Sequence, residues 1–192
     1  MKLHLHLGAH KTATTHFQNV MESNRNLYEK NTHYVSMDEF RVNVTQAGKL
    51  INPRYNSEVD EYLEKLKETK KQRLVISEEN IIGESQDIYC SKLLYSNVEK
   101  RVNRLKGFVA KFSEANIWIS IRSMDTFIPS LYCESLLHSK FRRFGLVFSG
   151  QYAQSWVPVI SILRETFPGA KINVISYDTY RTILPKWLTV IT

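Results

Sequence analysis

Cysteine is scarce in this chain: only Cys90 and Cys133 are present, and they do not form a CxxC pair. Two thiols cannot build the disulfide framework of a small secreted domain, so we expect them to be buried or chemically idle. Long apolar runs are also lacking, because no stretch approaches the roughly 18 to 20 apolar residues that a membrane-spanning helix needs. The opening residues MKLHLHLG alternate in polarity and lack the apolar core of a signal peptide. We therefore expect a cytoplasmic protein without a membrane span.

Internal repeats, low-complexity tracts and interdomain linkers are also absent, and 192 residues suit one domain over 1–192 better than two. Acidic residues are in the minority: 26 Lys and Arg against 19 Asp and Glu give a formal net charge of +7. A basic surface attracts anions such as nucleotides, phosphate and sulfated glycans. The basic residues are spread along the chain, so a solvated surface explains them as well as a polyanion site does. No nucleic-acid-binding motif accompanies them, and we predict no nucleic-acid partner.

Strand-like and helical segments alternate along the chain. Four segments have the polarity pattern of strands: residues 2–7, 73–77, 116–121 and 171–176. Apolar residues recur at helical spacing over residues 14–28, from 57 onward, and over 98–112, 126–138 and 156–167. This order predicts an α/β protein, a three-layer sandwich in which helices cover both faces of a mostly parallel sheet. Ligands of such proteins bind beyond the carboxyl ends of the strands.

Two segments have less regular patterns. Residues 42–56 are polar and contain Gly48 and Pro53, which indicates an irregular connection. Pro129 lies within one of the predicted helices. Proline is tolerated best in the first helical turn, so we expect this helix to begin shortly before Pro129.

The turn after the first predicted strand carries a lysine, hydroxyl groups and small residues. It reads HLGAHKTATT over residues 6–15 and leads into the first predicted helix. Backbone N–H groups and the positive end of the helix dipole would face a phosphate there, Lys11 adds a full charge, and Thr14 and Thr15 add hydroxyl donors. Lys11 follows Gly8 too closely for a Walker A motif. The composition indicates a phosphate-binding loop, and a turn that binds nothing is the alternative.

This segment resembles the 5'-phosphosulfate-binding loop of PAPS-dependent sulfotransferases, especially the bacterial and heparan-type branch whose loop reads roughly HxGxHKTGTT. PAPS is 3'-phosphoadenosine-5'-phosphosulfate, and the product of transfer is PAP. The resemblance implies a P-loop NTPase-like fold and cofactor contacts from the run His10, Lys11, Thr12, Ala13, Thr14 and Thr15. Ala13 stands where that family usually has glycine, and a positive φ at Ala13 would cost about 1 kcal/mol of strain.

A second feature follows the strand predicted over 116–121. Arg122 ends that strand and Ser130 follows in the next helix, an arrangement that resembles the family's 3'-phosphate site. Arginine binds two phosphate oxygens with its planar fork, and the serine adds a further donor. Alone, such a pair is common and would indicate a surface contact. Together with the loop, it indicates a nucleotide that carries phosphates at both ends.

An acidic pair, Glu78 and Glu79, ends the strand predicted over 73–77. Alternation places Ser77 and Glu79 on one side of the strand and Glu78 on the other. The segment RLVISEEN resembles the family's strand with a terminal Ser-x-Glu element, which implies that Glu79 is the catalytic base. Glu78 as the base is one alternative. The other is that both carboxylates only stabilise a helix N-terminus.

The resemblance implies transfer of a sulfuryl group from PAPS to a hydroxyl or amine acceptor, without a metal ion. Glu79 would take the acceptor's proton and Lys11 would stabilise charge on the leaving group, as in phosphoryl transfer. A saccharide, a lipid or a small metabolite could serve as the acceptor. His4 and His6 lack an evident third ligand, so we predict no metal site.

Two rival functions remain open. One is an ATP-dependent P-loop kinase, in which Glu78 or Glu79 would hold magnesium, although the position of Lys11 disfavours it. The other is a non-catalytic module that binds a nucleotide or polyanion. The resemblance stops at WLTVIT, before the C-terminal helix and covering loop of the family, so we expect a compact or truncated variant of the domain.

Overall fold

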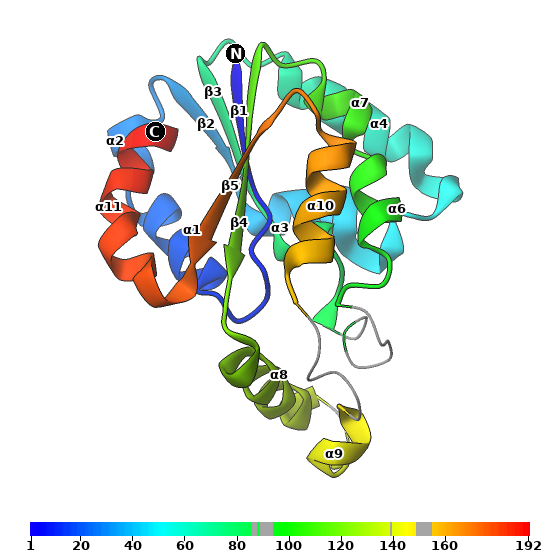
Figure 1. Cartoon of the computed structure of the whole chain (residues 1–192). Coiled ribbons are helices and arrows are strands. Elements are labelled where there is room, and N and C mark those ends of the chain that lie inside the picture. Colours follow the sequence, from blue (N-terminus) through cyan, green and yellow to red (C-terminus); the bar gives the residue numbers. More distant parts are fainter. Residues whose placement is uncertain (86–87, 89–93, 139, 149–154) are drawn as a thin grey trace.

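A central parallel sheet organises the chain. The computed structural model describes residues 1–85, 88, 94–138, 140–148 and 155–192 (Figure 1). Its strands are β1 (Lys2–His6), β2 (Thr32–Val35), β3 (Arg73–Ser77), β4 (Glu114–Ile121) and β5 (Lys171–Ser176). These five strands form one sheet in the order β2-β3-β1-β4-β5, and each neighbouring pair is parallel. The predicted α/β class with a parallel sheet is confirmed.

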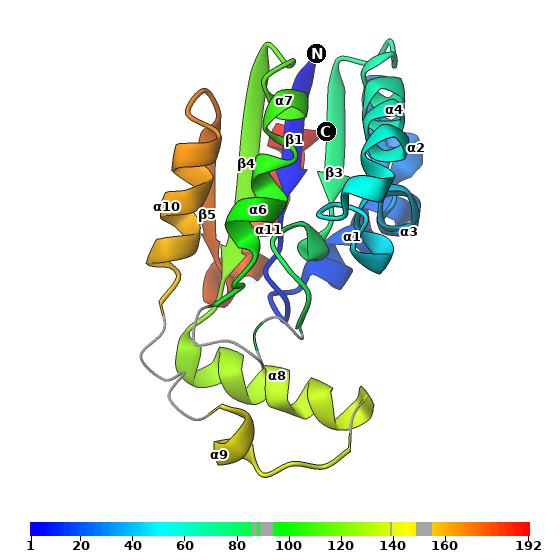
Figure 2. The same ribbon diagram turned by 90° about the vertical axis from the view of Figure 1, so that its right-hand side faces the viewer.

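Helices cover both faces of this sheet (Figures 1 and 2). One face carries α1 (Thr14–Ser23), α2 (Arg25–Tyr28) and α11 (Tyr180–Ile191), and the other carries α4 (Asn56–Lys67), α6 (Val98–Asn103), α7 (Lys106–Val109) and α10 (Val157–Thr166). The buried apolar residues divide in the same way, because Phe17 and Trp187 belong to one cluster and Leu63 and Leu163 to the other. The arrangement is the predicted three-layer sandwich.

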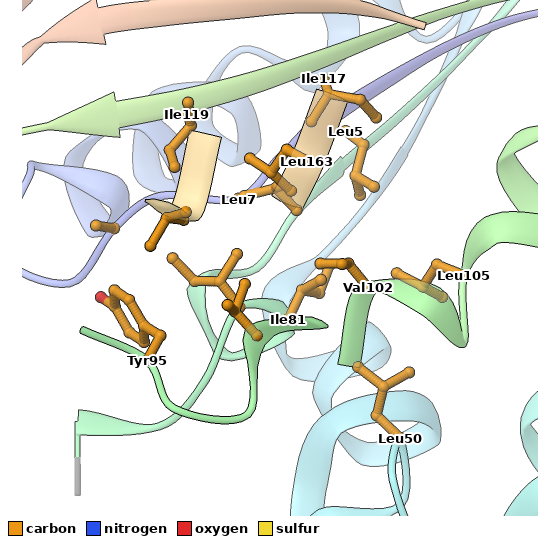
Figure 3. Packing of buried hydrophobic residues seen from close by; sticks show 14 of the residues in the cluster. Leu5, Leu7, Leu50, Ile81, Tyr95, Val102, Leu105, Ile117, Ile119 and Leu163 are labelled. Carbon is orange, nitrogen blue, oxygen red and sulfur yellow. The ribbon is translucent and has the colours of Figure 1, made fainter. Parts of the chain in front are cut away.

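The alternation within β1 explains this division. Leu5 and Leu7 are fully buried in the larger cluster, where Figure 3 shows them near Ile117 and Leu163. His6 points to the opposite face, and its ring centroid lies 4.8 Å from that of Trp187 in α11. Because side chains alternate along a strand, one short segment contributes to both cores.

Two predicted helices are interrupted. The segment predicted as a helix over 14–28 breaks at Asn24, so that α1 and α2 are separate, and Leu27 is 77% exposed instead of packed. The segment over 98–112 divides into α6 and α7. Val102 and Val109 remain buried on either side of that break, so packing retains the apolar face although the helix does not continue.

Pro129 lies in the second turn of α8 (Met124–His138), not in the first turn, so that prediction is wrong. A proline there removes one helical hydrogen bond and crowds the preceding turn. Its neighbours Phe127, Ile128 and Leu131 are all at most 1% exposed. Their burial stabilises the helix despite the proline.

The sequence patterns missed β2, α3 (Met37–Phe40) and α11. The segment predicted to be irregular contains a π-helical turn, Arg41–Thr45, and 3-10 turns at Gln46–Gly48 and Pro53–Tyr55. These elements are mostly too short for hydrophobic periodicity to mark them.

The carboxyl ends of the strands lie at one edge of the sheet, with α8 and α9 (Phe144–Val147) beyond it (Figures 1 and 2). β1 lies between β3 and β4. The chain leaves β1 toward β2 and leaves β4 toward β5, in opposite directions along the sheet. The carboxyl ends of β1 and β4 therefore form the switch point where open α/β sheets bind ligands.

Among the described residues, no helix has the length and apolar character needed to cross a membrane. Cys133 is exposed and forms no disulfide, whereas Cys90 lies outside the described residues.

Candidate functional site

The loop after β1 has an unusual backbone. Gly8, Lys11 and Ala13 have φ values of 68°, 58° and 66°, in the left-handed region. Thr12, between the last two, does not share this conformation. When right-handed and left-handed backbone conformations alternate, successive N–H groups point toward one side and form a concave anion-binding site. The positive φ at Ala13 means that the strain of about 1 kcal/mol foreseen for that position applies.

The start of α1 adds further donors to this loop. Ala13 is the N-cap residue of α1, and it supplies no side-chain acceptor. The first N–H groups of the helix, at Thr14 and Thr15, therefore keep their hydrogen-bonding capacity for a ligand. The helix dipole places partial positive charge at the same point. This end of α1 can hold a phosphate or sulfate group.

Internal hydrogen bonds fix the loop against β4. The Ala9 N–H donates to the Ser120 carbonyl at 2.9 Å, and the Ser120 N–H donates to the Gly8 carbonyl at 2.8 Å. The hydroxyls of Thr12 and Thr14 donate to the Ala9 carbonyl at 2.6 and 3.2 Å. These two hydroxyls are buried and stabilise the loop itself.

Lys11 and Thr15 are exposed, unlike their buried neighbours in the loop. Of the side chains predicted to contact the cofactor from this loop, these two are free to reach a ligand without rearrangement.

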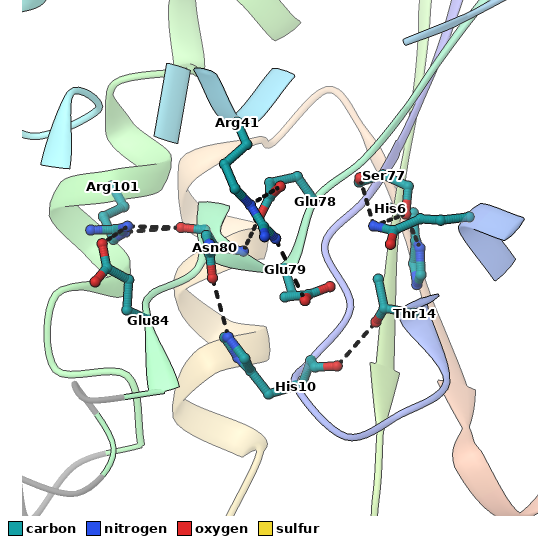
Figure 4. Close-up of polar contacts among 12 residues, drawn as sticks. His6, His10, Thr14, Arg41, Ser77, Glu78, Glu79, Asn80, Glu84 and Arg101 are labelled. Carbon is teal, nitrogen blue, oxygen red and sulfur yellow. Dashed lines mark hydrogen bonds and ion pairs between the residues drawn. The ribbon is translucent and has the colours of Figure 1, made fainter. Parts of the chain in front are cut away.

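His10 is buried at the base of the loop. Its Nδ1 lies 2.9 Å from the Tyr95 hydroxyl and its Nε2 lies 3.2 Å from Asn80 Oδ1 (Figure 4). An amide oxygen only accepts, so Nε2 carries the proton and Nδ1 accepts from Tyr95. Tyr95 is itself fully buried with a φ of 56°. His10 therefore fixes the loop through its ring and does not present a free nitrogen to a ligand.

Glu79 lies directly against the loop. A Cβ atom placed on Gly8 would come within 2.8 Å of Glu79 Cβ and 2.9 Å of Thr14 Oγ1, so only glycine permits this approach. The Glu79 side chain is 16% exposed, and its Oε2 atom is buried without a hydrogen-bond partner. Burial, reinforced by the negative charge of Glu78, raises the pKa of Glu79 to about 7. A carboxylate with a free oxygen and this pKa can accept a proton near neutral pH.

Glu78 has a different environment. Its side chain is 0% exposed and accepts hydrogen bonds from Nε and Nη2 of Arg41, each at 3.0 Å. It also accepts from the Asn80 N–H at 2.8 Å, as the N-cap of the 3-10 turn Glu79–Ile81. Burial raises the pKa of Glu78, and the hydrogen bonds from Arg41 oppose that shift. The proposed role of stabilising a helical N-terminus therefore fits Glu78, and Glu79 is the carboxylate with an available oxygen.

Arg122 comes from the end of β4 and reaches the same loop. Its Nη1 donates to the Lys11 carbonyl at 3.2 Å, its Nε donates to Thr126 Oγ1 at 3.0 Å, and its guanidinium lies 4.6 Å from the ring centre of Tyr177. Ser130 is partly exposed in α8. Within the described part of the chain, no hydrogen bond connects Ser130 to Arg122 or to the loop. The structure thus brings Arg122, but not Ser130, into contact with the loop.

A buried histidine connects the three central strands just before the site. His6 Nδ1 lies 2.9 Å from Ser77 Oγ, and its Nε2 lies 3.2 Å from Ser120 Oγ. Burial lowers the pKa of His6 to about 3, so its ring is neutral. Among the described residues, no group of three or more potential metal ligands occurs, at His6 or elsewhere.

Sequence patterns missed Arg41, Asn80 and Tyr95. Asn80 follows the acidic pair that drew attention to β3, so its position beside Glu79 was a usable signal. Arg41 and Tyr95 come from segments without a recognisable motif, and they meet the site only through the fold. With the geometry established, comparison adds no family: no protein-family model matches the chain, and no curated protein is significantly similar to it.

Proposed function

We propose that this protein is a sulfotransferase that binds PAPS and transfers its sulfuryl group to a hydroxyl or amine acceptor. The main support is the convergence of three features at one edge of the sheet: the anion-binding loop with Lys11, the arginine Arg122 at the end of β4, and the partly enclosed carboxylate of Glu79. The similarity of the loop to the sulfotransferase motif supports the same reading.

The residues present fit such a donor. The N–H groups at the start of α1 and the exposed Lys11 suit a 5'-phosphosulfate, and the fork of Arg122 suits a 3'-phosphate. In the described part of the chain, no carboxylate forms an ion pair with Lys11 or Arg122. Lys11 is therefore available to an anionic ligand, whereas Arg122 would have to share or exchange its hydrogen bonds to Thr126 and the Lys11 carbonyl to hold a phosphate with its fork. Ser130 would need to approach Arg122 to take part in the 3'-phosphate site.

Bound PAPS would supply a sulfuryl group on a phosphate leaving group. Glu79 accepts the proton of the acceptor hydroxyl or amine while the acceptor atom forms its bond to sulfur. Lys11 stabilises the negative charge that develops on the leaving phosphate oxygen. The chain needs no covalent intermediate, because the bond to sulfur forms as the bond to the leaving oxygen breaks.

The rival kinase reading requires a carboxylate that can hold magnesium. Glu78 is engaged by both nitrogens of the Arg41 fork and is completely buried, so it is not available for this role. Glu79 is then the carboxylate of the pair that a kinase would need for magnesium, and the magnesium dependence of ATP binding separates the two functions.

Calorimetric titration with PAP, AMP and ATP, the last with and without magnesium, tests the binding half of the proposal. We expect PAP to bind most tightly and independently of metal. Arg122→Ala should weaken PAP binding roughly 10- to 150-fold through loss of a charged hydrogen bond, whereas Arg181→Ala, at an exposed arginine of α11, should have little effect. Equal affinity for AMP would contradict two phosphate sites, and tighter magnesium-dependent binding of ATP would support a kinase.

Radiolabelled sulfuryl transfer from PAPS to a panel of saccharide, lipid and small-metabolite acceptors tests the chemical half. Glu79→Gln should preserve PAP binding and lower turnover by roughly 100-fold or more, the usual effect of removing a general base. PAP binding without transfer to any acceptor would favour the non-catalytic binding module.

A further inference from the structure

One arginine faces both carboxylates at the end of β3. Arg41 extends from the π-helical turn Arg41–Thr45 and is 31% exposed. Both of its hydrogen bonds to this acidic pair go to Glu78, at 3.0 Å each, while its Nη2 lies 3.8 Å from Glu79 Oε1 (Figure 4). The latter distance is too long for a hydrogen bond. Glu79 therefore interacts electrostatically with the Arg41 guanidinium but accepts no hydrogen bond from it.

The position of Glu78 is fixed from a second direction. Asn80 donates its backbone N–H to Glu78, and the Asn80 carbonyl accepts from Nε and Nη2 of Arg101 at 3.1 and 2.9 Å. Arg101 is only 2% exposed, and Asn80 also contacts His10 of the loop. The pair formed by Arg41 and Glu78 is thus part of a partly buried hydrogen-bond network that reaches the anion-binding loop.

Several charges act on Glu79 from the surrounding elements. Glu78 from the end of β3 and Glu134 from α8 disfavour its ionised form, and Arg41 favours it. Burial also disfavours ionisation. The other face of Glu79 contacts Gly8 of the loop, which carries no charge. Arg41 is thus the cation that counteracts two neighbouring carboxylates and burial.

We propose that Arg41 is a positioning residue for Glu79: its fork is committed to Glu78, so Glu79 is left with a free oxygen for the proton of the acceptor. This inference rests on the proposed role of Glu79 as the base. Two substitutions should then have opposite effects. Arg41→Gln removes the cation and leaves two buried carboxylates together, which raises the pKa of Glu79. Glu78→Gln removes the like charge and frees the fork to bind Glu79, which lowers that pKa.

The direct test is carbon-13 NMR titration of the glutamate side-chain carboxyls in the full chain, with Glu79→Gln used to assign the Glu79 signal. We expect Arg41→Gln to raise the midpoint by about one pH unit or more and Glu78→Gln to lower it by a similar amount. Arg41→Lys keeps the charge and should fall between the wild type and Arg41→Gln. Arg181→Gln serves as the control and should leave the midpoint unchanged. Should Arg41→Gln fail to fold, Arg41→Lys should still raise the Glu79 midpoint and Glu78→Gln should still lower it.

Midpoints that move in the same direction in the Arg41 and Glu78 variants, or that do not move, would overturn the proposal. A purely structural role for Arg41 would alter stability without opposite shifts. With an active acceptor, the acidic limb of the pH profile of kcat/KM should follow the same shifts. Opposite shifts by NMR combined with an absence of PAP binding would refute the proposed sulfotransferase function while leaving the role of Arg41 intact.

Discussion

Replacing Glu79 by glutamine should stabilise the protein above neutral pH and have much less effect below it. The folded state raises the pKa of Glu79 from 4.5 to about 7. Between these values the folded state binds more protons than the unfolded state, so stability falls as the pH rises through the window. At 1.36 kcal/mol per pKa unit, the ionised Glu79 costs the folded state about 3 kcal/mol above that window. Glu79→Gln removes this cost.

The measurement is urea unfolding at about pH 5 and about pH 8.5, followed by the fluorescence of the three tryptophans and analysed as a two-state transition. The difference in free energy of unfolding between the variant and the wild type should increase by about 2.5 kcal/mol from the lower to the higher pH, because pH 5 already lies slightly inside the window. Effects of the substitution that do not depend on pH cancel in this comparison. Glu165→Gln, at an exposed carboxylate in α10, is the matched control. A difference that is the same at both pH values would show that Glu79 titrates as an ordinary carboxylate.

Three further substitutions test the loop and the strand that precedes it. Gly8→Ala should lower the free energy of unfolding by about 2 kcal/mol or more, because the alanine would have to keep a strained φ of +68° and its Cβ would lie 2.8 Å from Glu79 Cβ. Gly169→Ala should be nearly neutral in the same urea experiment, because no atom lies within 4 Å of the added Cβ. Ala13→Gly should increase the free energy of unfolding by about 1 kcal/mol, since the φ of 66° suits glycine, and a decrease would contradict this account. Burial lowers the pKa of His4 to about 4, so the wild type loses stability as the pH falls below 6.5. His4→Phe removes this loss, and its effect on the free energy of unfolding should be about 2 kcal/mol more favourable at pH 5 than at neutral pH. Equal effects at both pH values would argue against a buried neutral ring.

The parts of the fold that the sequence predicted well are those with strong local patterns. The boundaries of β3 and β5 match the predicted segments, because a short apolar run in an α/β protein has few alternatives to a buried strand. β2 was missed since its four residues, THYV, carry no apolar run. The break at Asn24 was missed because apolar residues continue beyond it, although Leu27 is exposed. Periodicity records which residues are apolar and does not record where a helix ends.

The candidate site was predictable where its residues lie in one segment. The loop from Gly8 to Ala13 and the glutamate pair after β3 are both visible in the sequence. The partner of Glu78 was not, because Arg41 is 37 positions away in the chain and belongs to a turn without a pattern. The preference for Glu79 over Glu78 as the base stays a prediction, and the environment of each carboxylate supports it.

Because Glu79 lies against Gly8, an anion bound in the loop would affect the protonation of the Glu79 carboxylate. On the proposed function, a phosphate held in the loop brings negative charge toward Glu79 and favours its protonated form. Thermodynamic linkage is reciprocal, so ionisation of Glu79 must weaken binding of that phosphate by the same factor. Donor and product affinity should therefore decline as the pH rises through about 7, the pKa of Glu79. On the proposed function, the glycine that lets Glu79 lie against the loop would therefore also make nucleotide binding depend on pH.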